Sequence, residues 1–257
     1  GKDFNFKLFK FPSDLNASLR KTSPTMLCFS NYSWNFELSC KFAFLAKQRD
    51  PNVVTVFGGP NFSTDISGKI NFIKRHPEID FIIELEGEFG FVDIVRKLSD
   101  YNFNVSNLNK DEKKIINTCY LHENKLISGP IDRIKDINII PSPYLTGALD
   151  NFFTSPLYPI FETTRGCPFA CTFCADGLAS KNKIQRYDSE RTKDEIHYLA
   201  KRVKNISELG ITDLNFGMYK QDIVTAKIIA DIQNKYNYPI ILSSTVGKNM
   251  PERIIQV

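Results

Sequence analysis

Three of the six cysteines in this sequence lie within eight residues, at Cys167, Cys171 and Cys174. Thiolates this close together are typical of a loop that binds a metal cluster. The residues just before the loop, 158–162, are predicted to form a strand that leads directly into it. The remaining cysteines are isolated among apolar residues, so we predict buried thiols rather than disulfide partners for Cys28, Cys40 and Cys119.

The spacing of the loop cysteines favours an iron–sulfur cluster over zinc. A structural zinc site needs a fourth ligand, and the three histidines (His76, His122 and His197) are scattered, with none in the loop. A cubane cluster normally takes four Cys ligands, so three thiolates would leave one iron free to bind a small molecule. Zinc, a plain electron-transfer cluster and a coincidental group of thiols remain weaker alternatives.

The first half of the chain alternates between short apolar runs and helical patterns, which predicts an α/β fold. Such an order of strands and helices implies an open parallel sheet with right-handed crossovers. Ligands of such sheets bind beyond the carboxyl ends of the strands, where Ser30, Gly58-Gly59 and Glu86-Gly87-Glu88 fall. The predicted strands are 25–30, 53–57 and 81–83, and the predicted helices are 36–48, 65–75 (capped by Ser63 or Thr64) and 89–98.

Less regular segments flank this repeat. Residues 4–11 alternate Phe and Leu with polar residues, which predicts a strand. Residues 101–114 read as a polar loop, and 115–127 as a hairpin that turns at Glu123-Asn124. Two prolines make 139–144 an extended linker. We therefore expect one domain over residues 1–140, a linker over 141–155 and a second domain over 156–257.

The second domain continues the alternation after the cysteine loop. A capping box formed by Thr192 and Glu195 predicts a helix whose apolar face continues to Leu209 and ends at Gly210. The elements predicted after it are a strand at 211–217, a helix at 222–236, a strand at 239–243 and the start of a helix at 251–256. A strand-helix repeat of this kind is expected of a (β/α) barrel, whose sites lie at the carboxyl ends of its strands.

The cysteine spacing, with Phe173 just before the third cysteine, resembles the signature of the radical S-adenosylmethionine superfamily. The resemblance implies a [4Fe-4S] cluster on Cys167, Cys171 and Cys174. It also implies that S-adenosylmethionine binds the open iron, that Phe173 lies near its adenine, and that a 5′-deoxyadenosyl radical is released. The usual Gly-Gly-Glu is absent, and the positions that correspond to the contacts with S-adenosylmethionine are Asp213, Asn215 and Gly217.

The first domain resembles the cobalamin-binding domain of one branch of that superfamily. Ser30-Asn31-Tyr32 and Gly58-Gly59 approximate the elements that hold the cobalamin nucleotide tail, and Glu86-Gly87-Glu88 resembles an acidic turn of this branch. The resemblance implies cobalamin contacts at Ser30, Tyr32, Gly58, Gly59 and Glu88, and for Trp34 a place in the core is the alternative to a role at this site. It also implies an incomplete Rossmann-like domain followed by the first half of a partial (β/α) radical S-adenosylmethionine barrel.

The function that this resemblance implies is methyl transfer from methylcobalamin to an unactivated carbon or phosphorus of a small-molecule or natural-product substrate. A flavodoxin or ferredoxin would act as the one-electron reductant. Alternatives are a radical rearrangement, cyclisation or oxidation with a non-methylating or vestigial cobalamin domain, and a cluster- or cobalamin-based sensor. Three further cations are each expected to bind a carboxylate or phosphate or to form an ordinary ion pair: Arg165, Arg186 and Lys248.

Charge and hydropathy exclude other classes of function. Lys and Arg number 33 against 29 Asp and Glu, a net charge of +4 without a long basic run, so a nucleic-acid surface is not indicated. The sequence contains no apolar stretch near the roughly 20 residues of a membrane-spanning helix. Its first residues also lack the apolar core of a signal peptide, so a cytoplasmic protein is expected.

Overall fold

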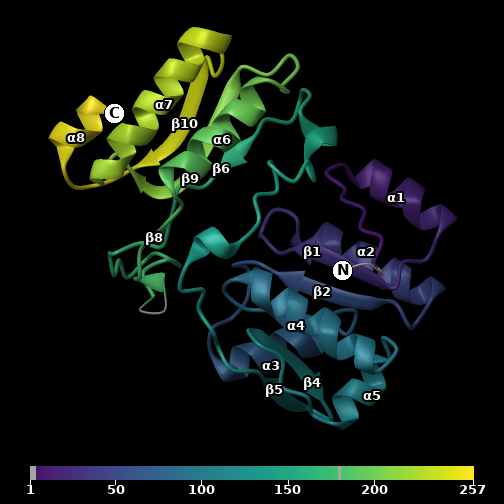
Figure 1. Cartoon of the computed structure of the whole chain (residues 1–257). Helices are drawn as coiled ribbons and strands as arrows, with labels where there is room; N and C mark the ends of the chain where they lie inside the picture. Colours follow the sequence, from purple (N-terminus) through teal and green to yellow (C-terminus); the bar gives the residue numbers. More distant parts are fainter. Residues whose placement is uncertain (1–3, 179–180) are drawn as a thin grey trace. The chain divides into compact units, whose positions relative to one another are not determined.

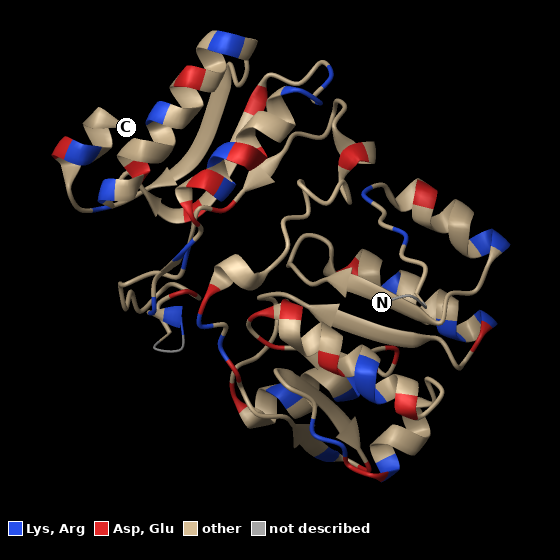
Figure 2. Cartoon of the chain, viewed as in Figure 1, with Lys and Arg blue, Asp and Glu red and all other residues tan. Residues whose placement is uncertain are grey.

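The structure is a computed structural model that describes residues 4–178 and 181–257. The chain divides into two compact units, Gly1–Ile134 and Lys135–Val257, and each is described by itself. Among the described residues, no helix is long and apolar enough to cross a membrane. Basic and acidic residues are interspersed along helices of both units, as α4 and α6 show in Figure 2.

The first unit is built on a five-stranded sheet in the order β1-β2-β3-β4-β5. The first three strands run parallel, whereas β4 and β5 form an antiparallel hairpin at one side. The predicted strands and the predicted hairpin are thus present, and the sheet is mixed rather than purely parallel. The strands are β1 (Met26–Ser30), β2 (Val54–Gly58), β3 (Phe81–Ile83), β4 (Thr118–His122) and β5 (Lys125–Ser128).

Helices cover both faces of this sheet and form three layers (Figure 1). On one face, α2 (Phe36–Arg49) and α3 (Ile66–Arg75) pack on Phe57 and Ile82. On the other face, α4 (Gly87–Asp100) and α5 (Val105–Lys110) pack on β2, β3 and β4. Cys40 and Cys119 are buried as predicted, but Cys28 is exposed because it lies on the edge strand β1.

Local sequence explains where these helices begin and where the predictions were wrong. Pro12 occupies the first turn of α1 (Pro12–Lys21), so the segment forms a helix; residues 4–9 are irregular rather than a strand. The cap of α3 is Asp65, whose carboxylate accepts from the Gly68 N–H at 2.7 Å, and not Ser63 or Thr64. The helix α5 lies in a segment that was predicted to be a loop.

The second unit is built on three parallel strands in the order β10-β9-β6, with α6 and α7 packed together against its apolar core. Its elements are β6 (Ile160–Phe161), β7 (Thr164–Arg165), β8 (Gln185–Arg186), α6 (Ser189–Ala200), β9 (Glu208–Phe216), α7 (Lys220–Tyr236), β10 (Ile241–Val246) and α8 (Pro251–Gln256). Two short 3-10 helices, Ile137–Ile139 and Asp150–Phe152, precede them.

The helix predicted to continue to Leu209 ends at Ala200. Thr192 lies inside α6 rather than at its cap, and its hydroxyl donates to the Asp188 carbonyl at 3.2 Å. Leu209 is instead fully buried in β9. Leu209 has the spacing of a residue on the helical face, but the parallel pairing of β9 with β6 and β10 makes it part of a strand.

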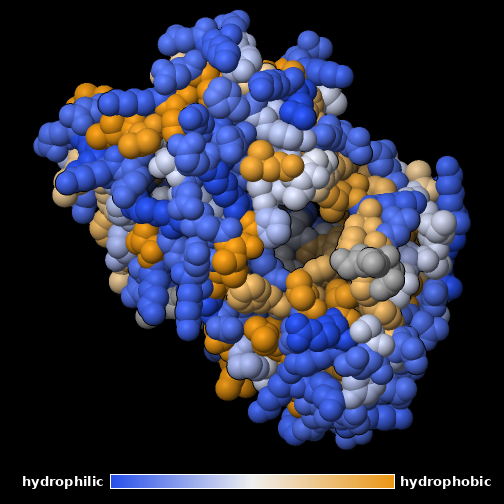
Figure 3. Space-filling model, in the orientation of Figure 1, coloured by the Kyte–Doolittle hydropathy of each residue, from blue (hydrophilic) through white to orange (hydrophobic). Residues whose placement is uncertain are grey.

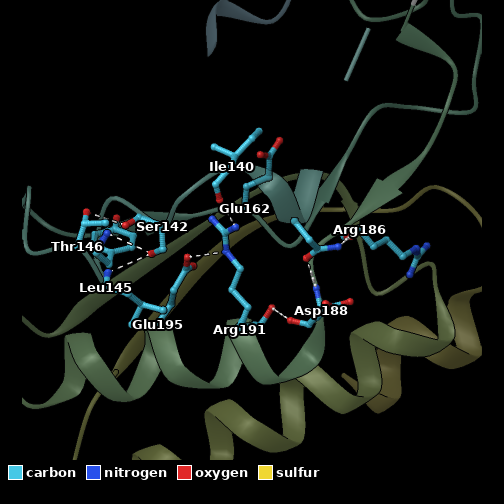
Figure 4. Close-up of polar contacts among 12 residues, drawn as sticks. Ile140, Ser142, Leu145, Thr146, Glu162, Arg186, Asp188, Arg191 and Glu195 are labelled. Atoms are coloured by element: carbon cyan, nitrogen blue, oxygen red, sulfur yellow. Dashed lines mark hydrogen bonds and ion pairs between the residues drawn. The ribbon is translucent and has the colours of Figure 1, made fainter. Parts of the chain in front are cut away.

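Side-chain contacts join residues 138–140 to α6 and to its N-cap Asp188 (Figure 4). Arg191 of α6 donates to the Glu195 carboxylate at 3.1 Å and to the Ile140 carbonyl. The Asp188 N–H donates to the Asn138 side chain at 2.9 Å. Tyr144 and Phe153 belong to the core of the second unit, so this segment is part of that unit's packing.

Candidate functional site

The three clustered cysteines lie between the antiparallel strands β7 and β8 of the second unit. Thr164 pairs with Arg186 and Arg165 with Gln185. After this pairing the chain turns at Gly166, whose φ is +100° and whose added Cβ would lie 2.3 Å from the Lys183 carbonyl oxygen. Only glycine fits that position without strain. The Cys167 N–H then donates to the Lys181 carbonyl at 3.1 Å.

Two successive turns fold the second part of the loop. The Cys174 N–H donates to the Cys171 carbonyl at 3.1 Å, and the Gly177 N–H donates to the Cys174 carbonyl at 3.0 Å. A Cβ at Gly177 would lie 2.4 Å from the Cys171 oxygen, so this turn also requires glycine. The two turns bring the last two cysteines onto one compact piece of backbone.

Polar groups from the ends of β9 and β10 reach the sulfur atoms. Asn215 of β9 donates its side-chain N–H to Cys167 Sγ at 3.3 Å, and the Lys248 ammonium lies 3.8 Å from Cys171 Sγ. The ammonium also lies 5.3 Å from the centre of the Phe173 ring. Both contacts place a donor or a positive charge beside a sulfur that would be anionic as a cluster ligand. The first of these contacts joins residues that are 48 positions apart in the sequence.

The remaining part of the loop faces solvent within the second unit. Cys167 and Cys171 are half-buried, whereas Cys174 is exposed and the Phe173 side chain is 84% exposed. All three thiols are free of disulfides. An exposed aromatic ring beside accessible thiols suits a surface that receives ligands.

Two of the predicted contacts with S-adenosylmethionine have structural duties in this unit. Asp213 is 2% exposed, and its carboxylate accepts from the Thr163 N–H at 2.7 Å, from the Thr164 N–H at 3.1 Å and from the Thr163 hydroxyl. Burial raises the pKa of Asp213. Gly217 has φ of +85°, and a Cβ there would lie 3.2 Å from Ile254 of α8. Asn215 is the member of the set that reaches the cysteine loop.

The three predicted cations differ in their contacts. Arg165 makes a two-pronged ion pair with Glu162 at 2.9–3.1 Å. Arg186 donates to Gln221 at 2.9 Å and stacks on the Tyr219 ring at 3.9 Å. The Lys248 ammonium, by contrast, lies 3.8 Å from Cys171 Sγ. Arg165 therefore forms an ordinary ion pair, whereas Arg186 stacks on an aromatic ring.

In the first unit, the parallel register brings the predicted residues together at the carboxyl end of the sheet, which is called the edge below. Ser30 pairs with Gly58, and Gly58 pairs with Ile83, so the loops that follow the three strands lie side by side. The buried Asn31 links two of them: its side chain donates to the Asn61 carbonyl at 2.9 Å and accepts from the Asn61 side chain at 3.2 Å. These hydrogen bonds hold the two loops together.

The two glycines at this edge differ in their surroundings. Gly59 has φ of +143°, and an added Cβ would lie 2.4 Å from the Asn31 carbonyl oxygen. A Cβ at Gly58 would meet only Ile83, at an ordinary 3.6 Å. Gly59 is therefore required by the approach of the two loops, a reason that the sequence alone did not reveal.

Aromatic and acidic residues complete the edge. Tyr32 and Trp34 are stacked with ring centroids 4.5 Å apart, and the Trp34 side chain is 79% exposed, so the alternative that it belongs to the core does not hold. Ser30 accepts from the Asn35 side chain at 3.1 Å. Glu88 is half-buried in the first turn of α4. Its neighbour Glu86 is buried and accepts from the Ile134 N–H at 3.0 Å.

The comparisons with known proteins match both units together. No family model matches the chain. Over its full length, the chain is 29% identical to the 2-(S-pantetheinyl)-carbapenam-3-carboxylate methyltransferase of Streptantibioticus cattleyicolor, of which it covers 37%. Over 91% of its length, it is 31% identical to the cobalamin-dependent radical SAM methyltransferase TokK of Streptomyces tokunonensis, of which it covers 34%. The homologues of this chain thus include the family of cobalamin-dependent radical SAM methyltransferases.

The fold agrees with this family. The cobalamin-dependent S-adenosylmethionine radical enzyme OxsB, solved with aqua-cobalamin and S-adenosylmethionine bound, superposes with a TM-score of 0.59 over 90% of this chain at 17% identity. The match covers 32% of OxsB. The first unit is accordingly a Rossmann-like domain, and the second holds strands of a radical S-adenosylmethionine barrel. The chain spans about a third of the length of the curated relatives that it matches.

Proposed function

We propose that this chain provides the cobalamin-binding unit and the cluster loop of a cobalamin-dependent radical S-adenosylmethionine methyltransferase. The observation that carries the proposal is the cysteine loop, in which Asn215 and Lys248 bring a hydrogen-bond donor and a positive charge to two of three clustered sulfurs. A reactive centre with anionic ligands needs such groups from the protein around it.

The residues of the loop fit a [4Fe-4S] cluster. Thiolates are the ligands that iron–sulfur clusters take, and Cys167, Cys171 and Cys174 are free, accessible and carried on turns that two glycines define. The loop thiols are not part of any set of three or more His, Cys, Asp or Glu ligand atoms within 4.8 Å of one another in the described chain. A cubane places its thiolates on different irons, so it does not require the tight grouping that a single ion does.

When bound, the cluster supplies one electron to S-adenosylmethionine and cobalamin carries the methyl group. The chain's own residues hold and tune these groups. The Asn215 amide stabilises negative charge at the Cys167 sulfur, which favours the reduced form of the centre. The Lys248 ammonium lies near both the Cys171 sulfur and the Phe173 ring, which would pack against adenine. Asp213 ties β9 to the chain that leads into the loop.

In the first unit, the carboxyl edge of the sheet fits cobalamin. Asn31, Asn61 and Gly59 hold two loops in close approach, which leaves the stacked pair of Tyr32 and Trp34 exposed beside them. A broad, flat macrocycle can pack against an exposed indole of this kind. We infer that Ser30, Tyr32, Gly58, Gly59 and Glu88 line this cobalamin site.

We further propose that the substrate is a small natural product methylated at an unactivated carbon, in a cytoplasmic reaction that takes electrons from a flavodoxin or ferredoxin. The two relatives compared above are named as methyltransferases, which favours methyl transfer. The name of the first refers to a carbapenam carboxylate; that compound is one candidate substrate for this protein.

Anaerobic reconstitution of the intact protein tests the proposal. We expect about four irons per chain, retention of hydroxocobalamin in equilibrium dialysis, and formation of 5′-deoxyadenosine from S-adenosylmethionine under reduction. Cys171→Ala should abolish the intact cluster, whereas Cys28→Ala, a substitution of an exposed cysteine in the other unit, should leave it unchanged. Stoichiometric zinc in place of iron, or absence of cobalamin retention, would refute the methyltransferase assignment.

A further inference from the structure

A second group of metal-ligating side chains lies in the first unit, away from the cysteine loop. Cys40 of α2, His76 at the end of α3 and Glu78 before β3 place one ligand atom each within 4.8 Å of one another. In the part of the chain that the structure describes, no other set of three His, Cys, Asp or Glu side chains meets this condition. The helices α2 and α3 cover the same face of the sheet (Figure 1).

The two distances from His76 to the other members of the group are close to those between ligands around one ion. His76 Nδ1 lies 3.8 Å from Cys40 Sγ and 3.1 Å from Glu78 Oε1. For tetrahedral zinc, bond lengths of about 2.3 Å to sulfur and about 2.0–2.1 Å to nitrogen or oxygen place neighbouring ligand atoms roughly 3.3–3.6 Å apart. The observed distances lie within a few tenths of an ångström of that range.

The surroundings hold the ligands in place. The His76 ring packs edge-on against Phe36, at 4.8 Å between centroids, and against Phe72 at 5.1 Å. Behind Glu78, the Thr55 hydroxyl donates to the backbone carbonyl of Glu78 at 2.6 Å. Cys40 is buried, and the side chains of His76 and Glu78 are only 23% and 11% exposed. Such packing fixes three convergent side chains at small entropic cost.

Charge in the group also favours a cation. A single Nδ1 faces both the thiol and the carboxylate, and it can donate a proton to only one of them. Within the described chain, His76 is the one basic group that pairs with the Glu78 carboxylate. A divalent ion would displace the thiol proton to solvent and neutralise both the thiolate and the carboxylate.

We propose that Cys40 Sγ, His76 Nδ1 and Glu78 Oε1 form a zinc site in the first unit, with water in the fourth position. Sulfur, imidazole and carboxylate together are a ligand set that suits zinc and not magnesium or calcium. The site joins α2 to the connection between α3 and β3, so zinc would stabilise the packing of this face. His76 and Glu78 precede β3, whereas the cobalamin loops follow the strands, so the site is distinct from the cobalamin edge.

The test uses the full chain with Cys167, Cys171 and Cys174 all changed to Ala, which removes the other thiolates that could take zinc. We expect one zinc per chain in competition with a chromophoric chelator. Cobalt should give a thiolate-to-metal charge-transfer band and the intense visible bands of a tetrahedral site. His76→Gln and Glu78→Gln should each weaken zinc binding by about tenfold or more. The matched controls His122→Gln and Cys119→Ser should bind as the parent does.

A second measurement guards against unfolded variants. Zinc should raise the unfolding temperature of the parent and of both controls, and should not raise that of His76→Gln. The same zinc content is expected in the cluster-loaded protein with its loop cysteines intact. The proposal is overturned if the parent takes up no zinc or if either ligand substitution leaves the affinity unchanged. Because the loop cysteines are absent from this test, its outcome is independent of the proposed methyl transfer.

Discussion

Replacing Gly59 by Ala is the most direct way to disturb the proposed cobalamin site at the carboxyl end of the sheet. The added methyl group would lie 2.4 Å from the Asn31 carbonyl oxygen, and contacts under 3.0 Å are not tolerated by real Cβ atoms. One of the two loops must therefore move by about 0.6 Å or more. Asn31 cannot yield easily, because it is fully buried and exchanges side-chain hydrogen bonds with Asn61.

Two costs combine in this variant. Overpacking a rigid contact costs about 1–3 kcal/mol, and a non-glycine residue at φ of +143° costs about 1–3 kcal/mol more. We expect Gly59→Ala to lower the free energy of unfolding of the first unit by about 3 kcal/mol, which corresponds to roughly 10 °C in the unfolding midpoint of a domain of this size. Gly58→Ala, whose Cβ would meet Ile83 at 3.6 Å, should change the free energy of unfolding by about 1 kcal/mol or less.

The assay is thermal unfolding followed by circular dichroism and by the fluorescence of Trp34, the single Trp of the chain, which reports on the first unit. Cobalamin affinity, measured by equilibrium dialysis at a temperature where both variants are folded, should fall for Gly59→Ala and stay within about twofold of the parent for Gly58→Ala. Equal unfolding midpoints for the two variants would contradict the steric argument.

Three other predictions follow from the same contacts. Asn215→Ala removes the donor to Cys167 Sγ, so the reduction potential of the assembled cluster should fall by tens of millivolts in an electron-paramagnetic-resonance titration; an unchanged potential would remove Asn215 from the site. In metal-free protein, the raised pKa of Cys40 means that the neutral thiol favours the folded state, so the free energy of unfolding should fall as pH rises from 9.0 toward about 12, and Cys40→Ser should flatten that slope. Molecules should associate through β10, because among the described strands it pairs only with β9 and its Ile241, Leu242 and Val246 are 40–56% exposed; Figure 3 shows that apolar residues also lie elsewhere at the surface, and a monomeric sample in light scattering would count against this.

Local sequence predicted most elements of the fold because their signals are local. The apolar runs that became β1, β2 and β3 and the helical spacing of α2, α4 and α7 each lie within a few turns of chain. The predictions were wrong for segments in which packing against distant residues overrode the local sequence pattern. The alternation in residues 4–11 indicated a strand, yet residues 4–9 are irregular and a helix begins at Pro12. Leu209 fitted a helical face, yet strand pairing places it in β9.

The candidate site likewise has a part that the sequence predicted and a part that it did not. The spacing of Cys167, Cys171 and Cys174 was sufficient by itself to indicate a cluster and its family, because ligands on one short loop need no distant partner to meet. Nothing in the sequence indicated that Asn215 and Lys248 would reach the sulfurs, since these contacts depend on where β9 and β10 end beside the loop.

Tertiary structure alone decided the remaining assignments. Cys40, His76 and Glu78 were separate residues in the sequence and become neighbours only because α2 and α3 pack on one face of the sheet. Gly59 carried an ambiguous turn signal, and the approach of the Asn31 backbone explains why it must be glycine. The sequence determined the chemistry available at each position, whereas the fold determined which of those groups meet, because contacts between distant segments exist only after the sheet has set their register.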